Sequence, residues 1–230
     1  AEWFIERGIG EDRALLLDGE HVLAAKLRWP EDIGPGLVTA KLIHRPGGSS
    51  RGVAQTSEGI EINVSGLPKD ASEGRDIPVL VTRAPMAERG RLKRAQGLHK
   101  RTDAHHAPQP ASFLPEGKSV RRFPTGLWDD LWAEAWDSEI AFAGGSLIAS
   151  LTPAMTVIDI DGDLPPRELA IAAVPAIAQL VRRFDLGGSI GIDFPTLPEK
   201  AQRRAVDETL AEALADWPHE RTAMNGFGFV

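Results

Sequence analysis

Residues 1–83 contain short apolar segments separated by turn-forming residues, a pattern typical of a β-rich fold. The apolar run Leu15–Leu17, the tight turn Asp18-Gly19 and a second apolar segment predict a hairpin within residues 2–27. Further strands are expected at residues 37–44, 51–56, 60–64 and 77–83. Several short strands at this spacing indicate a small barrel, and the five-stranded OB-fold is the nucleic-acid-binding candidate.

Residues 95–124 are rich in His, Pro, Arg and Gln and show little periodicity, so we expect a linker over 96–124. Its histidines, His99, His105 and His106, have no partner at ligand spacing, which favours a linker over a metal site. A short helix should follow, because Trp128, Trp132 and Trp136 repeat every four residues. This stripe indicates packing in the core or at a subunit interface rather than base stacking.

The pattern of about the last ninety residues predicts a β-α-β-α unit. Strands are expected at 146–150, 155–160 and 189–194. A helix opening at Asp163-Leu164-Pro165 should run to Phe184, and a capping box at 196–199 should begin a second helix that ends near Trp217. A right-handed crossover through the first helix makes its flanking strands parallel and brings their carboxyl ends to one sheet edge, where α/β proteins place their sites.

Three carboxylates are expected at this edge. Asp159 and Asp161 alternate along one strand and share a face, and Asp193 occupies the matching end of the next strand. Converging acidic groups beside apolar residues repel one another unless a cation lies among them, and oxygen-only ligands select Mg²⁺ or Mn²⁺. The alternative is that Asp161-Gly162 is only a turn and Asp193 only ends a strand; residue pattern alone leaves both open.

Composition and charge narrow the class of partner. The chain has no cysteine, which excludes disulfides and thiolate zinc sites and favours a reducing cytoplasm. No signal segment and no long apolar run occurs, so we expect a soluble protein without a membrane partner.

The net charge of −7 is uneven along the chain: residues 1–125 contain 19 Lys and Arg against 16 Asp and Glu, whereas residues 126–230 contain 7 against 17. A basic cluster opposed only by Glu88 suits phosphate contact, with a solvated linker as the alternative. Its members are Arg83, Arg89, Arg91, Lys93, Arg94, Lys100 and Arg101.

Two blocks of the carboxyl-terminal part resemble the catalytic region of the ribonuclease E/G family. Residues 138–161 contain a Gly-Gly-Ser strand that leads to Ile-Asp-Ile-Asp161, where the family has Ile-Asp-Ile-Asn. Residues 183–194 contain Asp-Leu-Gly-Gly followed by Ile-Asp193-Phe, as the family does, and Asn225-Gly226-Phe227-Gly228 is similar to a Phe-Gly turn that follows there.

The resemblance implies an α+β protein with a DNase I-like catalytic subdomain over residues 125–230. In it Asp159 and Asp193 would bind one Mg²⁺, with Mn²⁺ as an alternative, and activate water for RNA cleavage that leaves a 5′-phosphate. Asp161 replaces the usual Asn, which would add a ligand, shift the preferred metal or weaken the site.

The amino-terminal part is similar to the family in outline. The likeness implies an RNase H-like hairpin over residues 1–30, an OB-fold-like RNA-binding barrel over 31–95, and RNA contacts by Arg89, Arg91, Lys93 and Arg94. No Phe, Trp or Tyr occurs between Trp29 and Phe113, so affinity should come from phosphate contacts and depend strongly on salt.

The family's 5′-end-sensing segment and its zinc-binding cysteines have no counterpart in this sequence. We therefore expect cleavage indifferent to the RNA 5′ end and no zinc-linked tetramer, with a homodimer still open.

Three functions are consistent with these features. The first is a cytoplasmic Mg²⁺-dependent endoribonuclease that cuts single-stranded RNA, because unpaired strands expose their backbone to a shallow site. The second is an RNA-binding protein derived from such enzymes that cleaves weakly or not at all. The third is a phosphodiesterase with another substrate, because fold alone does not fix chemistry.

Overall fold

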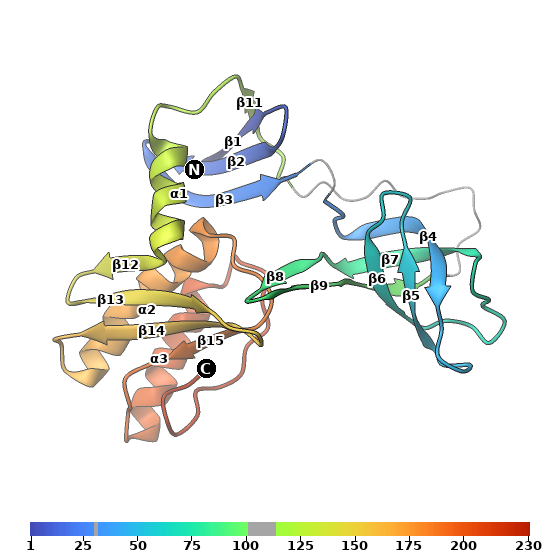
Figure 1. The fold of residues 1–230 in the computed structure, drawn as a ribbon. Helices are drawn as coiled ribbons and strands as arrows, with labels where there is room; N and C mark the ends of the chain where they lie inside the picture. Colours follow the sequence, from blue (N-terminus) through green and yellow to red (C-terminus); the bar gives the residue numbers. More distant parts are fainter. Residues whose placement is uncertain (30–31, 101–113) are drawn as a thin grey trace. The chain divides into compact units, whose positions relative to one another are not determined.

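The structure, a computed structural model, describes residues 1–29, 32–100 and 114–230 (Figure 1). Arg101, His105, His106 and the middle of the expected linker lie outside these residues. The chain divides into two compact units, one formed by residues 1–7, 13–26 and 116–230 and the other by residues 8–12 and 27–115. The architecture is mixed α+β, as predicted.

A closed five-stranded barrel forms the core of the second unit, consistent with the predicted OB-fold. Its strands are β4 (Gly36–His44), β5 (Arg51–Gln55), β6 (Glu61–Ser65), β7 (Asp76–Arg83) and β10 (Ala95–His99). Their order is β10-β6-β5-β4-β7, and β10 closes the barrel by pairing parallel to β6 and antiparallel to β7. Alternate residues of each strand point inward to a core that includes Leu42, Ile62 and Val79.

The four predicted strands of this barrel are confirmed, but the fifth, β10, lies in the segment expected to be a linker. Its inward positions are Ala95 and Gly97, which are small and give no apolar alternation. Gly97 is small for a physical reason, because a Cβ there would lie 2.5 Å from Val79 Cγ1 and 3.0 Å from the Leu80 carbonyl oxygen. The barrel closes because the backbone of β10 approaches its neighbours this closely.

A two-stranded hairpin precedes β10. It consists of β8 (Met86–Glu88) and β9 (Arg91–Lys93), paired antiparallel around Gly90, whose φ is +81°. A positive φ favours glycine at this turn. Three members of the basic cluster, Arg89, Arg91 and Lys93, therefore lie on a short β-hairpin.

The first unit contains a small sheet of order β11-β1-β2-β3. Its strands are β1 (Glu2–Arg7), β2 (Asp12–Asp18), β3 (His21–Arg28) and β11 (Lys118–Val120). The predicted hairpin is confirmed as β2 and β3, while β11 lies at the far end of the expected linker and pairs parallel to β1. Helix α1 (Leu127–Asp137) buries Leu131 against Leu15 and Leu17 of this sheet.

The tryptophan stripe of α1 packs only in part. Trp128 stacks on Phe123 with ring centroids 6.1 Å apart and lies beneath the Arg13 guanidinium. Trp132 and Trp136 are exposed, so core packing was the right expectation for Trp128 alone.

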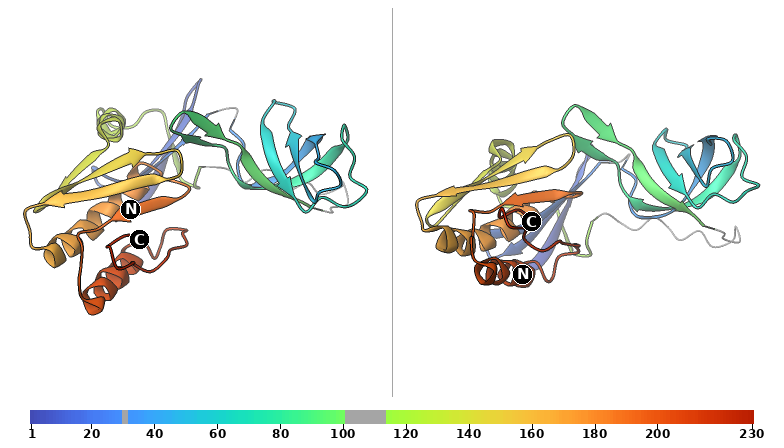
Figure 2. Two further views of the ribbon diagram at one scale, coloured as in Figure 1. Left: turned by 60° about the horizontal axis from the view of Figure 1, so that its bottom comes forward. Right: turned by 90° about the horizontal axis from the view of Figure 1, so that it is seen from below.

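The larger sheet of this unit contains β12 (Glu139–Phe142), β13 (Gly145–Leu151), β14 (Thr156–Gly162) and β15 (Ile190–Asp193), in that order. The first three strands are antiparallel, and β15 pairs parallel to β14 after the crossover through α2 (Pro166–Arg183), as predicted. Figure 2 shows α2 and α3 (Lys200–Ala213) on one side of this sheet. Their apolar faces form one core with Leu147, Ile158 and Ile192.

The predicted helix starts differ from the structure. Helix α2 is preceded by Pro165 and α3 by Glu199, and neither residue makes a side-chain capping bond. The predicted starts at Asp163 and Thr196 lie two residues before Pro165 and three residues before Glu199. No helix among the described residues is long and apolar enough to cross a membrane.

The close approach at Gly97 generates a stability prediction. Gly97→Ala should destabilise the barrel by about 1–3 kcal/mol, because the added methyl group overpacks a dense core. Gly47→Ala is the control, since its Cβ would meet nothing within 4 Å, and it should change stability by less than about 0.5 kcal/mol. Urea unfolding of both variants measures the difference; equal stabilities would show that β10 does not close the barrel as described.

Candidate functional site

Asp159 and Asp193 are direct partners in the parallel pairing of β14 and β15. Adjacent strands lie about 4.8 Å apart, so in-register side chains emerge from the same face as close neighbours. Both residues are exposed on the side of the sheet opposite α2 and α3, called the open face below. The crossover through α2 thus produces the carboxylate pair that the sequence predicted.

Asp161 is separated from this pair. It lies two residues farther along β14, about 6.6 Å in an extended strand, and its partner across the sheet is Ser146. Its Oδ1 accepts a hydrogen bond of 2.9 Å from the Gly162 backbone N–H. Among the described residues no group of three or more His, Cys, Asp and Glu side chains is arranged to hold a metal. The pairing register therefore sets Asp159 directly beside Asp193, with Asp161 one strand repeat farther along β14.

A continuous row of partners crosses the open face at the level of the pair. From β12 outward it runs through Glu139, Ile148, Asp159, Asp193 and Phe229. Ile148 is 43% exposed, so the carboxylate pair has an apolar flank on the β13 side. Phe229 supplies the other flank from the last residues of the chain.

The Phe229 ring packs over Gly191 of β15. A Cβ at Gly191 would overlap Phe229 Cζ and lie 2.9 Å from Met155 Sδ. Gly191 and Asp193 share the open face because side chains alternate along the strand. Glycine at position 191 therefore makes room for the aromatic ring beside the carboxylate pair.

Backbone bonds hold the end of the chain against β15. Val230 and Ile192 exchange N–H to carbonyl hydrogen bonds of 3.1 and 3.2 Å, and the Phe194 N–H donates to the Gly228 carbonyl over 3.1 Å. The chain end thus covers the edge of β15, which would otherwise present unpaired backbone groups.

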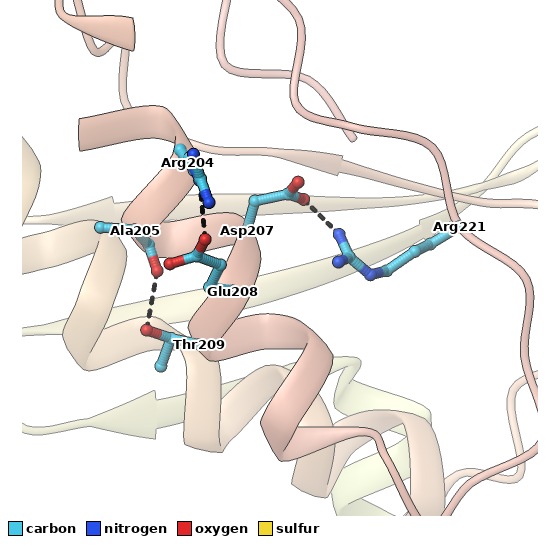
Figure 3. Close-up of polar contacts among 6 residues, drawn as sticks. All are labelled: Arg204, Ala205, Asp207, Glu208, Thr209 and Arg221. Atoms are coloured by element: carbon cyan, nitrogen blue, oxygen red, sulfur yellow. Dashed lines mark hydrogen bonds and ion pairs between the residues drawn. The ribbon is translucent and has the colours of Figure 1, made fainter. Parts of the chain in front are cut away.

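The preceding segment is tied to α3, as Figure 3 shows: the Arg221 guanidinium pairs with the Asp207 carboxylate. One turn away on the same helix, Arg204 Nε donates to Glu208 over 2.7 Å, and this hydrogen bond raises the pKa of the guanidinium. Farther back, Lys26 pairs with Asp185 and its Nζ lies 4.9 Å from the centre of the Trp217 ring. These contacts fix the course of the segment that ends beside Asp193.

The predicted RNA-contacting residues lie in the barrel unit. Arg89 and Arg91 are exposed on the β8–β9 hairpin, and Lys93 at its end is half-buried. Arg94 Nε pairs with the Glu61 carboxylate. Its carbonyl also accepts a 2.7 Å bond from Arg83. Arg83 and Arg94 therefore stabilise the barrel unit through contacts within it, and the exposed Arg89 and Arg91 on the hairpin remain candidates for phosphate contact.

A groove of about 610 Å³ runs over the outer face of the barrel. Asn63 of β6 and Gln96 of β10 are direct partners in its floor, and Arg51 of β5 lies at one side. The face of the second and third strands is where OB-folds bind oligonucleotides. None of the described residues that line the groove is Phe, Trp or Tyr, in agreement with the aromatic gap in the sequence.

No protein-family model matches this chain, and a search of curated proteins finds no match either. The likeness to the ribonuclease E/G family therefore rests on the sequence motifs alone.

Sequence reasoning missed the residues that flank the pair. Phe229 and Gly191 act through a pairing between the chain end and β15 that no local pattern encodes. The available signal was the turn at Asn225-Gly226, which indicates that the chain reverses direction before its end.

The packing of Phe229 on Gly191 can be tested by a double-mutant cycle. Gly191→Ala should destabilise the first unit by about 1–3 kcal/mol, because the methyl group displaces the ring and the paired chain end. In a Phe229→Ala background the same substitution should cost far less, since the obstructing ring is gone. Thermal or urea unfolding of the four proteins gives the coupling; strictly additive losses would contradict this contact.

Proposed function

We propose that this chain is a metal-dependent endoribonuclease of the ribonuclease E/G type that cleaves single-stranded RNA. The in-register pair Asp159 and Asp193 on the open face is the observation that carries the proposal. Both residues stand in the motifs that resemble the family's catalytic strands. Residues 125–230 would then form the DNase I-like catalytic subdomain.

The donor set suits Mg²⁺, with Mn²⁺ as an alternative. Mg²⁺ retains several waters and is usually held by one or two carboxylates together with substrate phosphate, so a pair of exposed aspartates is sufficient. When bound, the cation would lower the pKa of water for attack on the phosphodiester and offset the charge that develops on phosphate. Asp159 and Asp193 would hold it, and water and substrate phosphate would supply its remaining ligands.

The acidic composition of this part of the chain favours a bound cation before RNA approaches. Residues 126–230 contain 17 acidic against 7 basic residues, so phosphate would be repelled from the open face. Neutralising the carboxylate pair removes the nearest part of this repulsion. Ile148 and Phe229 flank the pair with apolar surface, which limits water around the reacting phosphate and strengthens electrostatic interactions there.

Binding of the RNA strand would fall largely to the barrel unit. Arg89 and Arg91 on the hairpin supply positive charge for phosphate, and the amides of Asn63 and Gln96 in the groove supply hydrogen bonds for exposed base edges. An unpaired strand presents both kinds of group, whereas a duplex hides its base edges. This division favours single-stranded RNA as the substrate.

The second candidate is an RNA-binding protein that cleaves weakly or not at all. Asp161 favours it, because this position carries Asn in the resembling family and here adds a negative charge one strand repeat from the pair. In this case the barrel and hairpin would still bind RNA, and the open face would not cleave it.

Cleavage of a labelled single-stranded RNA distinguishes the two candidates. The chain should cut it in Mg²⁺ and not in EDTA, leaving 5′-phosphates, and Asp193→Asn should lower the rate at least about 100-fold by removing a ligand. Asp163→Asn is the matched control, since Asp163 is an exposed carboxylate just beyond the same strand and should tolerate the change.

Either of two other results would count against the proposal. Binding of RNA without cleavage would support the second candidate, and reversion of Asp161 to Asn would then be the next variant. Equal activity of the Asp193→Asn and Asp163→Asn proteins would place the reaction elsewhere in the chain.

A further inference from the structure

Phe227 is the most exposed aromatic residue near the carboxylate pair. Its side chain is 83% exposed, whereas Phe229, two residues later, packs over Gly191. An aromatic ring left in water gains nothing for the fold. The exposed ring is therefore available to contact a ligand.

The turn that carries Phe227 is held by its own hydrogen bonds. Asn225 Oδ1 accepts from the N–H groups of Phe227 over 2.8 Å and Phe229 over 3.1 Å. The Asn225 N–H donates to the Phe229 carbonyl over 2.9 Å, and the Gly228 N–H to the Asn225 carbonyl over 3.2 Å. Four bonds within five residues leave the backbone of this turn little freedom.

The turn is also pressed against the end of β15. Gly228 has a φ of +92°, and a Cβ there would lie 2.5 Å from the Phe194 carbonyl oxygen. Only glycine combines that conformation with that contact. Because Phe229 is the pairing partner of Asp193, the turn that carries Phe227 is two residues along the chain from that pairing.

We propose that Phe227 is a stacking platform for one unpaired nucleobase of an RNA strand held at Asp159 and Asp193. The inference rests on the proposed function and adds the residue that positions the strand. An aromatic face stacks on every base, so this contact would fix the strand without selecting its sequence. It would supply the base stacking that the groove of the barrel, with no Phe, Trp or Tyr among its described lining residues, does not offer.

A double-mutant cycle, with one change in the protein and one in the RNA, tests this contact. The full chain and Phe227→Ala are compared on a short RNA and on versions with one abasic site, moved along the strand. With wild type, one abasic position should lower kcat/KM about tenfold, the usual order for one stacked base. With Phe227→Ala the intact RNA should lose the same factor, and the abasic site at that position should cause no further loss.

Two other variants separate stacking from general effects of aromatic removal. Phe227→Trp should keep the wild-type rate, because a larger aromatic face also stacks. Trp136→Ala removes a ring that is 80% exposed on α1 and should leave cleavage unchanged. Losses that are additive for Phe227→Ala at every abasic position would overturn the proposal.

The same cycle is repeated with RNA affinity as the readout. Failure of the proposed function and failure of this inference can then be told apart. Position-specific coupling in affinity without any cleavage would retain the platform and reject the endonuclease. Cleavage without coupling in either measurement would retain the endonuclease and reject the platform. Neither cleavage nor coupling would reject both.

Discussion

The parallel pairing of β14 with β15 is the constraint on which the candidate site depends. The crossover through α2 makes the two strands parallel, and the register of the pairing sets Asp159 directly beside Asp193. A shift of one residue would turn one carboxylate into the apolar core formed with α2 and α3. That core, through Ile158 and Ile192, fixes the register and with it the distance between the two carboxylates.

The end of the chain extends the sheet beyond β15. Its last residues pair with β15 and cover backbone groups that would otherwise be exposed, while Gly191 leaves space for the Phe229 ring. Contacts of Arg221 and Trp217 guide the segment there from α3. The open face consequently has carboxylates at its centre and apolar side chains on both flanks.

The sequence predicted elements whose residues alternate or repeat regularly. Four strands of the barrel, the β-α-β unit and the pairing of Asp159 with Asp193 follow from such patterns. Strand β10 was not predicted because its inward positions are Ala95 and Gly97. These residues are small, and at Gly97 the backbone lies too close to its neighbours for a larger side chain. Strand β11 was not predicted because three residues are too few to show the alternation of a strand. Its pairing with β1 also joins segments more than a hundred residues apart. Asp161 shares the strand and face of Asp159, but strand geometry separates it from Asp193.

The central claim is that Asp159 and Asp193 form one divalent-cation site. Titration of the full chain with Mn²⁺, followed by the electron paramagnetic resonance signal of the free ion, tests it without requiring RNA or turnover. The account predicts one Mn²⁺ bound per chain, competed by Mg²⁺, and loss of this binding in both Asp159→Asn and Asp193→Asn while Asp163→Asn retains it. Equal binding by all four proteins would contradict the account, as would a wild-type chain that binds no Mn²⁺ at millimolar concentration.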